Sequence, residues 1–271
     1  MKIQEVIDAL ELFAPLPLQE SYDNAGLQVG LTGADVSGAL LCLDVTEDVI
    51  DDAVRRGFNL VISHHPLLFR GLKQLSDADY VQRTVWKAVM NGVCIVSMHT
   101  NLDNAQGGVN HKIAQLLGLH DVEFLADVRT VSDPRNGETP ETQLTGGSGI
   151  IGCLQMPVGA EEFIHHVKKT FGVQCCMTNQ LLDRPISKVA ICGGAGAFLL
   201  KNAIRKGADA FITGEVHYHE FFGADQQIQI MSIGHYESEQ YTTEIFKQII
   251  AERCPQLPVA EYGSTNPICY W

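Results

Sequence analysis

The sequence predicts an α/β fold built from two related lobes, and two observations support this prediction. First, short apolar runs alternate with stretches of helical periodicity along most of the chain. Strands that are apolar almost throughout are typical of a largely parallel sheet with helices on both faces. Second, residues 55–63 resemble residues 205–213. This internal similarity predicts two α/β halves that face each other across a cleft, outside the carboxyl ends of their strands.

The first lobe is expected to cover residues 1–128. Apolar residues at helical spacing predict a helix over 3–13, which Pro15 and Pro17 end. Turn formers and glycines predict an ordered loop over 21–30. The remaining predicted elements are a strand at 39–45, a helix capped by Thr46, a strand at 58–63, a helix at 77–91, a strand at 93–98 and a helix near Val109.

A linker or long loop is predicted over residues 129–148, which are rich in turn formers and poor in apolar side chains. The second lobe is expected to cover 149–271, with residues 236–271 able to pack back on the first lobe. Its predicted strands are 149–156, 173–178, 186–192, 209–213, 228–233 and 258–262, and its predicted helices are 161–171, one ending near Lys206, and 236–253.

The composition narrows the class of protein. The chain has 271 residues, of which 45% are hydrophobic, and a formal net charge of -13. Such a negative chain repels phosphate backbones, so general nucleic-acid binding and anionic-membrane binding are not expected. No apolar run approaches the roughly 18 residues of a membrane span, and the N-terminus reads as a helix rather than a signal peptide. The eight cysteines include no CxxC pair, which favours reduced thiols in a cytoplasmic protein.

The candidate site residues follow apolar runs in both halves. In the first half, His64 and His65 end one run and His99 ends the next, with Asp103 four residues later. In the second half, His235 ends a run and Glu239 follows four residues later. Imidazoles and carboxylates gathered where buried strands end are what a divalent metal site needs, and this mixed set suits Zn, Mn, Fe or Ni.

Each of these residues also has a simpler structural interpretation. His64 and His65 are compatible with a hydrogen-bonded pair at a strand end. Asp103 is compatible with a turn or capping residue, and Glu239 with a first-turn acid favoured by the helix dipole. The fit of all these positions to one two-fold pattern favours the metal site over these separate explanations.

Other residues are weaker candidates. Three roles fit His99: a further metal ligand, a residue that orients a ligand from outside the coordination sphere, and a proton-transfer group; we predict one of the last two. Glu215 and His219 are expected to line a substrate pocket. Residues 193–196, which read Gly-Gly-Ala-Gly between a predicted strand and a predicted helix, suit either a phosphate held by backbone N–H groups or a tight turn, and we favour the turn.

Several motifs resemble those of the NIF-three-like family, whose members are often named GTP cyclohydrolase 1 type 2 homologs. The resemblance runs from about Ile3 to Tyr262, and this chain has Tyr22 where the family usually has Trp. The motifs are Tyr22-Asp23-Asn24-Ala25-Gly26-Leu27-Gln28-Val29-Gly30, Ile62-Ser63-His64-His65-Pro66, His99-Thr100-Asn101-Leu102-Asp103, Ile212-Thr213-Gly214-Glu215 and Gly234-His235-Tyr236-Glu237-Ser238-Glu239.

The resemblance implies two α/β lobes with a dinuclear metal site in the cleft between them. It implies two divalent ions per chain and a toroidal homohexamer. It also implies that Glu239 bridges the ions, and that the ligands are His64, His65, Asp103, His235 and Glu239.

The leading hypothesis is a metal-dependent hydrolase, in which two divalent ions supply a nucleophile at neutral pH and polarise the bond attacked. The family name suggests a nucleotide substrate, with opening of the imidazole ring of GTP. A phosphoester or amide bond of another small molecule fits the same centre. The alternative hypothesis is a metal-binding regulatory or assembly protein without turnover.

Overall fold

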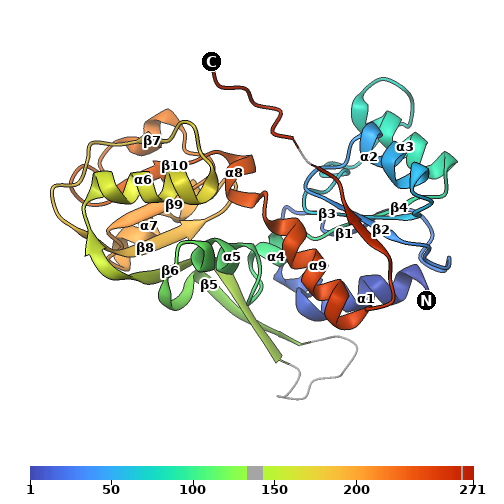
Figure 1. Ribbon diagram of the computed structural model, residues 1–271, viewed down its shortest axis with the longest axis horizontal. Coiled ribbons are helices and arrows are strands. Elements are labelled where there is room, and N and C mark those ends of the chain that lie inside the picture. Colours follow the sequence, from blue (N-terminus) through green and yellow to red (C-terminus); the bar gives the residue numbers. More distant parts are fainter. Residues whose placement is uncertain (133–142, 264) are drawn as a thin grey trace. The chain divides into compact units, whose positions relative to one another are not determined.

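The chain forms a mixed α/β protein with two sheets, seen in a computed structural model that describes residues 1–132, 143–263 and 265–271 (Figure 1). It divides into two compact units. Unit 1 comprises Met1–Leu102 and Thr242–Thr265, and unit 2 comprises Asp103–Tyr241 and Asn266–Trp271. Each unit contains one of the two sheets.

The sheet of unit 1 has five strands in the order β1-β4-β3-β2-β11. Strands β4, β3, β2 and β11 are parallel, and β1 pairs antiparallel with β4 at one edge. The central strands are buried on both faces, as their apolar sequences require. The strand bounds are β1 Gly26–Val29, β2 Ala39–Cys42, β3 Leu60–Ser63, β4 Cys94–Ser97 and β11 Val259–Glu261.

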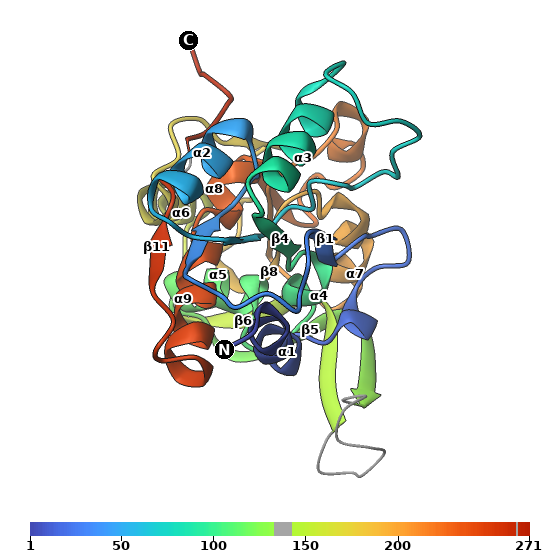
Figure 2. The same cartoon turned by 90° about the vertical axis from the view of Figure 1, so that its right-hand side faces the viewer.

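Helices cover both faces of this sheet. α2 and α3 pack against each other on one face, and α1 packs against α9 on the other (Figure 2). Asp79 caps α3, because its carboxylate accepts a hydrogen bond from the Gln82 backbone N–H. The bounds are α1 Ile3–Phe13, η1 Leu16–Leu18, α2 Glu47–Arg55, α3 Tyr80–Met90, α4 Thr100–Asp103 (whose last residue begins unit 2) and α9 Thr242–Arg253.

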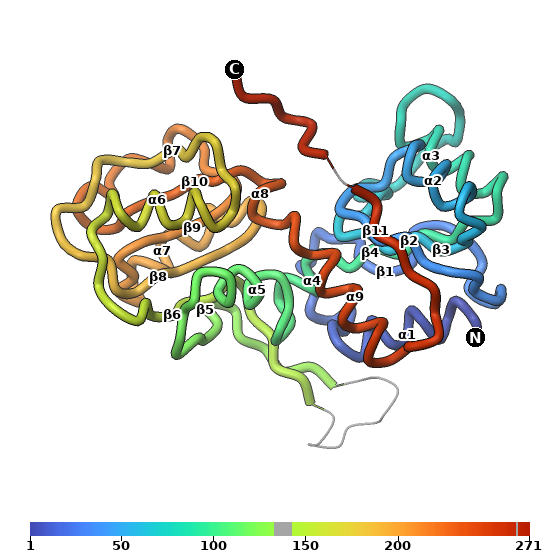
Figure 3. Tube along the Cα trace, in the orientation of Figure 1, coloured from blue at the N-terminus to red at the C-terminus, as the bar shows by residue number. Residues whose placement is uncertain are grey.

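The late segment of the chain completes unit 1. β11 lies beside β2 in parallel register, with Ala260 opposite Leu40, and the tube drawing shows the two strands side by side (Figure 3). The β2–β11 pair at one edge of the sheet is therefore formed by residues more than two hundred positions apart in the sequence.

The sheet of unit 2 has six strands in the order β5-β6-β8-β9-β10-β7. Only the central strands β8, β9 and β10 are parallel, and the others pair antiparallel. The bounds are β5 His120–Ser132, β6 Gln143–Val158, β7 Met177–Thr178, β8 Ile186–Cys192, β9 Ala210–Thr213 and β10 Gln229–Ser232. The helices are α5 Val109–Leu116, α6 Ala160–Phe171, η3 Ala197–Leu199, α7 Leu200–Arg205, η4 Tyr218–Phe221 and α8 His235–Glu239.

Several sequence predictions are wrong in detail. The predicted linker over 129–148 is wrong where the structure describes it, because 129–132 belong to β5 and 143–148 to β6; residues 133–142 lie outside the described part. The two long strands pair antiparallel, so backbone hydrogen bonds order residues that carry few apolar side chains. The sequence placed the change of lobe in this segment, whereas the units divide between Leu102 and Asp103.

Three other local predictions need correction. The loop predicted over 21–30 contains β1, and the helix predicted over 236–253 is divided into α8 and α9. The strand predicted over 173–178 is only Met177–Thr178. The prediction of a largely parallel sheet is confirmed for unit 1, where only β1 is antiparallel, and is wrong for unit 2, where β5, β6 and β7 pair antiparallel. Among the described residues, no helix is both long and apolar enough to span a membrane.

Candidate metal centre

Three histidines gather where two neighbouring parallel strands of unit 1 end. His64 and His65 follow β3 directly, and His99 follows β4 by two residues. The backbone holds the turn after β3 in place, because the N–H groups of His64 and His65 both donate to the Leu43 carbonyl, at 3.2 and 3.0 Å. The parallel strands therefore bring three imidazoles to one edge of the sheet, as the sequence pattern predicted for His64 and His65.

The three imidazoles form a compact group. One ring nitrogen of each lies within 4.8 Å of a ring nitrogen of the other two. The ring centroids of His64 and His65 are 4.9 Å apart, and those of His64 and His99 are 5.3 Å apart. His64 is completely buried, whereas His65 and His99 retain a small exposed fraction. This group can hold a metal ion, because imidazole is a common ligand of Zn, Fe, Ni and Cu.

The Nδ1 atom of each imidazole faces an oxygen acceptor. His64 Nδ1 lies 2.9 Å from the Met98 carbonyl oxygen. His65 Nδ1 lies 2.8 Å from Asp44 Oδ1, and His99 Nδ1 lies 2.7 Å from an oxygen of Asp23. An acceptor at Nδ1 requires a proton on that nitrogen, so in the neutral imidazole the lone pair is on Nε2. Histidines that bind metals typically have this arrangement, which sets both tautomer and ring orientation.

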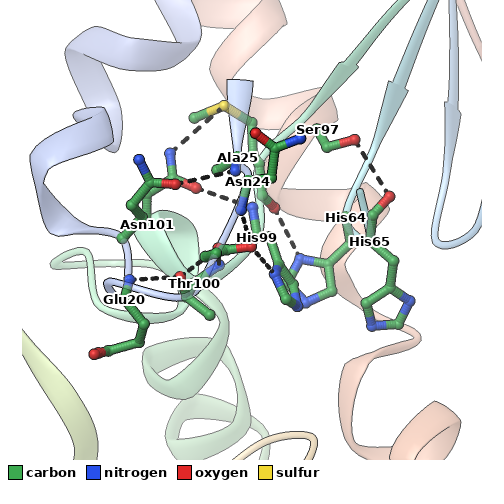
Figure 4. A network of polar contacts seen from close by, with 12 residues as sticks. Glu20, Asn24, Ala25, His64, His65, Ser97, His99, Thr100 and Asn101 are labelled. Atoms are coloured by element: carbon green, nitrogen blue, oxygen red, sulfur yellow. Dashed lines mark hydrogen bonds and ion pairs between the residues drawn. The ribbon is translucent and has the colours of Figure 1, made fainter. Parts of the chain in front are cut away.

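Asp23 makes more hydrogen bonds than the other two acceptors, and Figure 4 labels its partners His99 and Thr100. Its side chain is fully buried. Oδ1 accepts from His99, and Oδ2 accepts from the backbone N–H of Thr100 at 3.0 Å and from the Thr100 hydroxyl. Burial raises the pKa of this carboxyl, but the hydrogen bonds and charge of His99 and the Thr100 hydrogen bond outweigh it and lower the pKa to about 2.

Two buried serines stabilise the turn after β3 that carries His64 and His65. Ser63 and Ser97 end adjacent strands, and their hydroxyl oxygens are 2.7 Å apart. The His65 carbonyl oxygen lies 2.9 Å from the Ser63 hydroxyl and 3.2 Å from the Ser97 hydroxyl, so one serine donates to this carbonyl and the other donates either to it or to its partner serine. The polar ends of β3 and β4 are thus satisfied within the protein, and the position of His65 depends on them.

Unit 2 holds a second group of candidate ligands at the end of β10. His235 is the first residue of α8 and Glu239 lies one turn later, with His235 Nε2 3.1 Å from Glu239 Oε2. His235 Nδ1 lies 2.9 Å from Glu215 Oε1, so Glu215 holds this imidazole as Asp23 holds His99. Two ligand atoms bound to one ion at about 2.1 Å are separated by roughly 3–3.5 Å, which matches the separation of this pair.

The glycine-rich turn at 193–196 makes room for this pair. Gly194 has φ +58°, and a Cβ built there would lie 2.4 Å from Glu239 Oε1. The backbone N–H groups of Gly193, Gly194 and Gly196 donate to Asn110, Ser238 and Thr213. Because three of the four N–H groups already have side-chain partners, the turn interpretation is favoured over phosphate binding.

The donor chemistry of both groups suits a borderline divalent cation. Unit 1 supplies imidazoles whose Nδ1 protons are held by a carbonyl and two carboxylates, and unit 2 supplies an imidazole beside a buried carboxylate. Nitrogen and carboxylate donors of this kind fit Zn, Mn, Fe or Ni. The residues present therefore fit the ions that the sequence pattern predicts.

The remaining predicted residues are placed less decisively. Asp103 begins unit 2, and the Asn110 side chain donates to its carbonyl oxygen at 3.0 Å. His219 packs against the rings of Tyr218 and Phe222. Glu215, expected to line a substrate pocket, contacts His235.

Sequence reasoning missed Asp23 and Asp44 as partners of histidines. Asp23 lies in the motif at 22–30 that was noticed without a function, and Asp44 is two residues beyond β2. The position of Asp44 at a parallel strand end was a signal that could have found it.

The fold and the histidine groups define a two-sheet mixed α/β protein with candidate metal-binding residues at its strand ends. Comparison with known proteins gives the family. A model of the family described as Duf34/NIF3 (NGG1p interacting factor 3) matches residues 1–267. The chain belongs to this family, which confirms the resemblance seen in its motifs.

Relatives and solved structures agree with this assignment. The chain is 33% identical to a Clostridium perfringens protein named GTP cyclohydrolase 1 type 2 homolog, covering 88% of this chain and 87% of that protein. A protein of the same name from Campylobacter jejuni is 29% identical over the full length of both. The crystal structure of a hypothetical protein of Staphylococcus aureus matches with a TM-score of 0.87 and 25% identity, covering 100% of this chain and 99% of that one.

Proposed function

We propose that this protein is a metal-dependent hydrolase whose two divalent ions are bound by His64, His65, Asp103, His235 and Glu239. The observation that carries the proposal is the shared orientation of the histidines. In both units, the imidazoles present Nε2 for coordination because Nδ1 faces an oxygen acceptor.

When bound, a pair of divalent ions supplies Lewis-acid chemistry and a nucleophile at neutral pH. The residues of the chain hold and orient the ligands. Asp44 and Glu215 fix the rings of His65 and His235, and the glycine turn leaves space for the Glu239 carboxylate. Burial of Glu239 and His64 excludes water from part of the ligand set, which strengthens electrostatic interactions there.

For the substrate, we propose a small molecule with a hydrolysable bond, and a nucleotide is the first candidate. The relatives named GTP cyclohydrolase 1 type 2 homolog support ring opening of a purine nucleotide as the reaction to test first. Phosphoesters and cyclic amides remain the other substrate classes, because a two-metal centre attacks them by the same chemistry.

We also propose that the chains assemble into a homohexamer in the cytoplasm. Apolar side chains exposed on α3 support an assembly, since Tyr80, Trp86, Val89 and Met90 each have between 43% and 76% of their surface exposed. All eight cysteines lie in the described part of the chain and none forms a disulfide there, as expected in a reducing compartment. Sedimentation should find a species of six chains, and a monomer at micromolar concentration would contradict the assembly.

The test of function is a screen of the metal-analysed protein against nucleotides, phosphodiesters and cyclic amides. Wild type should turn over at least one class, and Glu239→Gln should lose that activity while keeping its circular-dichroism spectrum. Glu162→Gln, which changes an exposed carboxylate of α6, serves as the matched control and should keep full activity. Equal activity in Glu239→Gln and wild type would rule out the proposed role of Glu239. A metal-loaded wild type that turns over nothing and loses stability in Glu239→Gln would favour the regulatory or assembly protein instead.

A further inference from the structure

We propose that unit 2 carries a binding site for a small organic cation of the quaternary ammonium class, in a pocket between β7 and η4. The pocket has a volume of about 360 Å³, which lies within the range of small-molecule sites. None of its described lining residues belongs to the set proposed to bind metal ions, so this inference goes beyond the proposed hydrolase and does not rest on it. The lining includes Met177, Asn179, Tyr218, Phe221, Phe222 and Asp225.

The first argument is the aromatic surface of the pocket. Tyr218 and Phe222 have 72% and 66% of their surface exposed, and exposed apolar side chains gathered in one place indicate a binding surface. Their ring centroids are 5.3 Å apart. A cation is attracted to the face of an aromatic ring when it lies within about 6 Å of the ring centroid. One cation can therefore interact with both rings.

The angle between these two rings favours a compact cation over a flat heterocycle. Aromatic rings stack with their planes parallel and offset, but the planes of Tyr218 and Phe222 are inclined at 76°. A flat ligand stacks on only one of them, whereas a tetrahedral ammonium group presents the same surface in every direction. The Asn179 amide, which could bind the edge of a heterocycle, already donates to the Ile228 carbonyl and accepts from the Ile230 N–H, both at 2.9 Å.

Charge is the second argument. Among the described residues that line the pocket, Asp225 alone carries a charge, and its exposed carboxylate is negative at neutral pH. The chain as a whole has a formal net charge of -13, which raises the concentration of cations near its surface. A phosphorylated ligand would meet this carboxylate without a lysine or arginine in the described lining to compensate. The pocket therefore favours a cationic ligand over an anionic one.

The third argument is that hydrogen bonds fix both sides of the pocket. On the η4 side, the His217 N–H donates to Glu220 Oε2 at 2.7 Å, and the Gln227 side chain donates to the Gly223 carbonyl at 2.8 Å. On the other side, Met177 belongs to β7, which pairs with β10 at the edge of the sheet of unit 2 (Figure 1). A pocket held in this way loses little conformational entropy when a ligand binds.

The experiment is a titration of the full chain with choline, followed through the methyl signal of choline in NMR spectra. A parallel titration uses 3,3-dimethyl-1-butanol, which has the shape of choline with a neutral carbon in place of the charged nitrogen. Wild type should bind choline more tightly than the alcohol. Phe222→Leu should lower the affinity for choline by roughly 3–30-fold, the loss expected for one cation–π contact. Asp225→Asn should lower the affinity for choline and leave that for the alcohol unchanged.

The matched control is Phe198→Leu. Phe198 is an exposed aromatic residue of the same unit, with 58% of its surface accessible, and it lies in η3 rather than in the described lining of the pocket. This variant should bind choline as wild type does. Because all three substituted positions are exposed, each variant should keep the circular-dichroism spectrum of wild type.

Three results would overturn the inference. The first is equal affinity of wild type for choline and the neutral alcohol, and the second is unchanged choline affinity in both Phe222→Leu and Asp225→Asn. The third is no binding of choline or tetramethylammonium by wild type. In that case, sedimentation with phosphatidylcholine vesicles would assign the pocket to a lipid surface, and a change of assembly in Phe222→Leu would assign it to a contact between copies of the chain. The proposed hydrolase is unaffected by any of these results.

Discussion

The strand pairs β3–β4 of unit 1 and β9–β10 of unit 2 follow one backbone plan with different side chains. In each pair, the residue after the second strand donates its N–H to the last residue of the first strand: Met98 to Ser63 at 2.9 Å, and Ile233 to Thr213 at 3.0 Å. The last residue of each second strand is a serine, Ser97 or Ser232, whose hydroxyl contacts a carbonyl of the neighbouring turn. The turns carry His64-His65 in unit 1 and Gly214-Glu215 in unit 2.

The difference between the pairs is one of burial and charge. In unit 1 the carboxylate behind His99 is fully buried, whereas in unit 2 the Glu215 side chain behind His235 is 51% exposed. Ahead of the first strand, unit 1 uses the neutral Asn59 to bind the backbone of Ser37, and unit 2 uses Asp209 to bind the backbone of Ser187 and Lys188. One backbone plan thus supports an imidazole-rich group in unit 1 and a carboxylate-rich group in unit 2, because the side chains at the strand ends differ.

The cores behind the two strand pairs should respond differently to truncation. Phe211 and Val61 occupy equivalent positions in β9 and β3, and both are completely buried. Phe211→Ala should lower the free energy of unfolding by roughly 3–5 kcal/mol, and Val61→Ala by roughly 2 kcal/mol, because it removes less apolar volume. Denaturant unfolding measures both. Equal losses would show that the two sites relax to different degrees.

Two glycines of unit 2 provide a sharper comparison, one in a crowded turn beside Glu239 and one in an open turn. Gly194 and Gly207 both have positive φ, +58° and +71°, but only Gly194 has a group within 4 Å of a built Cβ. Gly207→Ala should cost only backbone strain, roughly 1–2 kcal/mol. Gly194→Ala should cost more, since its Cβ displaces Glu239, and it should also weaken metal binding. Identical metal affinity in the two variants would contradict the role of this turn.

The free energy of unfolding should depend on pH through Asp209, which is charged where the equivalent residue of unit 1, Asn59, is neutral. Burial raises the pKa of Asp209, but hydrogen bonds from the Lys188 and Ser187 N–H groups and the contact with Arg184 outweigh it and lower the pKa. Because its pKa is lower in the folded state, Asp209 contributes its full stabilisation above the ordinary carboxyl pKa of about 3.9. This contribution is lost as the pH falls through the folded-state pKa.

The measurement is the unfolding free energy of wild type and Asp209→Asn against pH. The variant should be the less stable near neutrality, and the gap should shrink below about pH 4. Asn59→Asp, the reverse exchange in unit 1, is the matched control for charge at this position. A gap that stays constant down to pH 2 would show that Asp209 contributes through shape alone.

The smallest effects are expected at the two serines that end β4 and β10. Ser97→Ala and Ser232→Ala should each cost roughly 1 kcal/mol, the usual contribution of one hydrogen bond. Ser97→Ala should in addition weaken metal binding slightly, because Ser97 bonds the His65 carbonyl. Thermal unfolding and Zn²⁺ competition of both variants test this, and a larger affinity loss in Ser232→Ala would reverse the expected order.

The sequence predicted the elements that depend on local chemistry. Apolar runs and helical spacing identified α1, α2 and the strands β2, β3, β8, β9 and β10 to within a few residues. The strand β5 and residues 143–148 of β6 were missed, because the described outer residues of the two strands carry few apolar side chains and are ordered by pairing with each other. Pairing partners depend on the whole chain, so residue types alone do not reveal them.

The same limit applies to the candidate site. Strand ends identified the histidines, since the carboxyl ends of parallel strands meet at one edge of a sheet. The partners Asp23 and His99 are 76 residues apart in the sequence, and only the folded chain brings their side chains to 2.7 Å. Membership of the Duf34/NIF3 family was predictable, because the motifs are contiguous in the sequence.

The most direct test of the account is elemental analysis of the full chain after growth in metal-replete medium, repeated on His64→Ala and Glu239→Gln. The account predicts two divalent ions per wild-type chain and a loss in each variant, with secondary structure retained. Fewer than one ion per wild-type chain, or full occupancy in both variants, would contradict the claim that these residues bind metal.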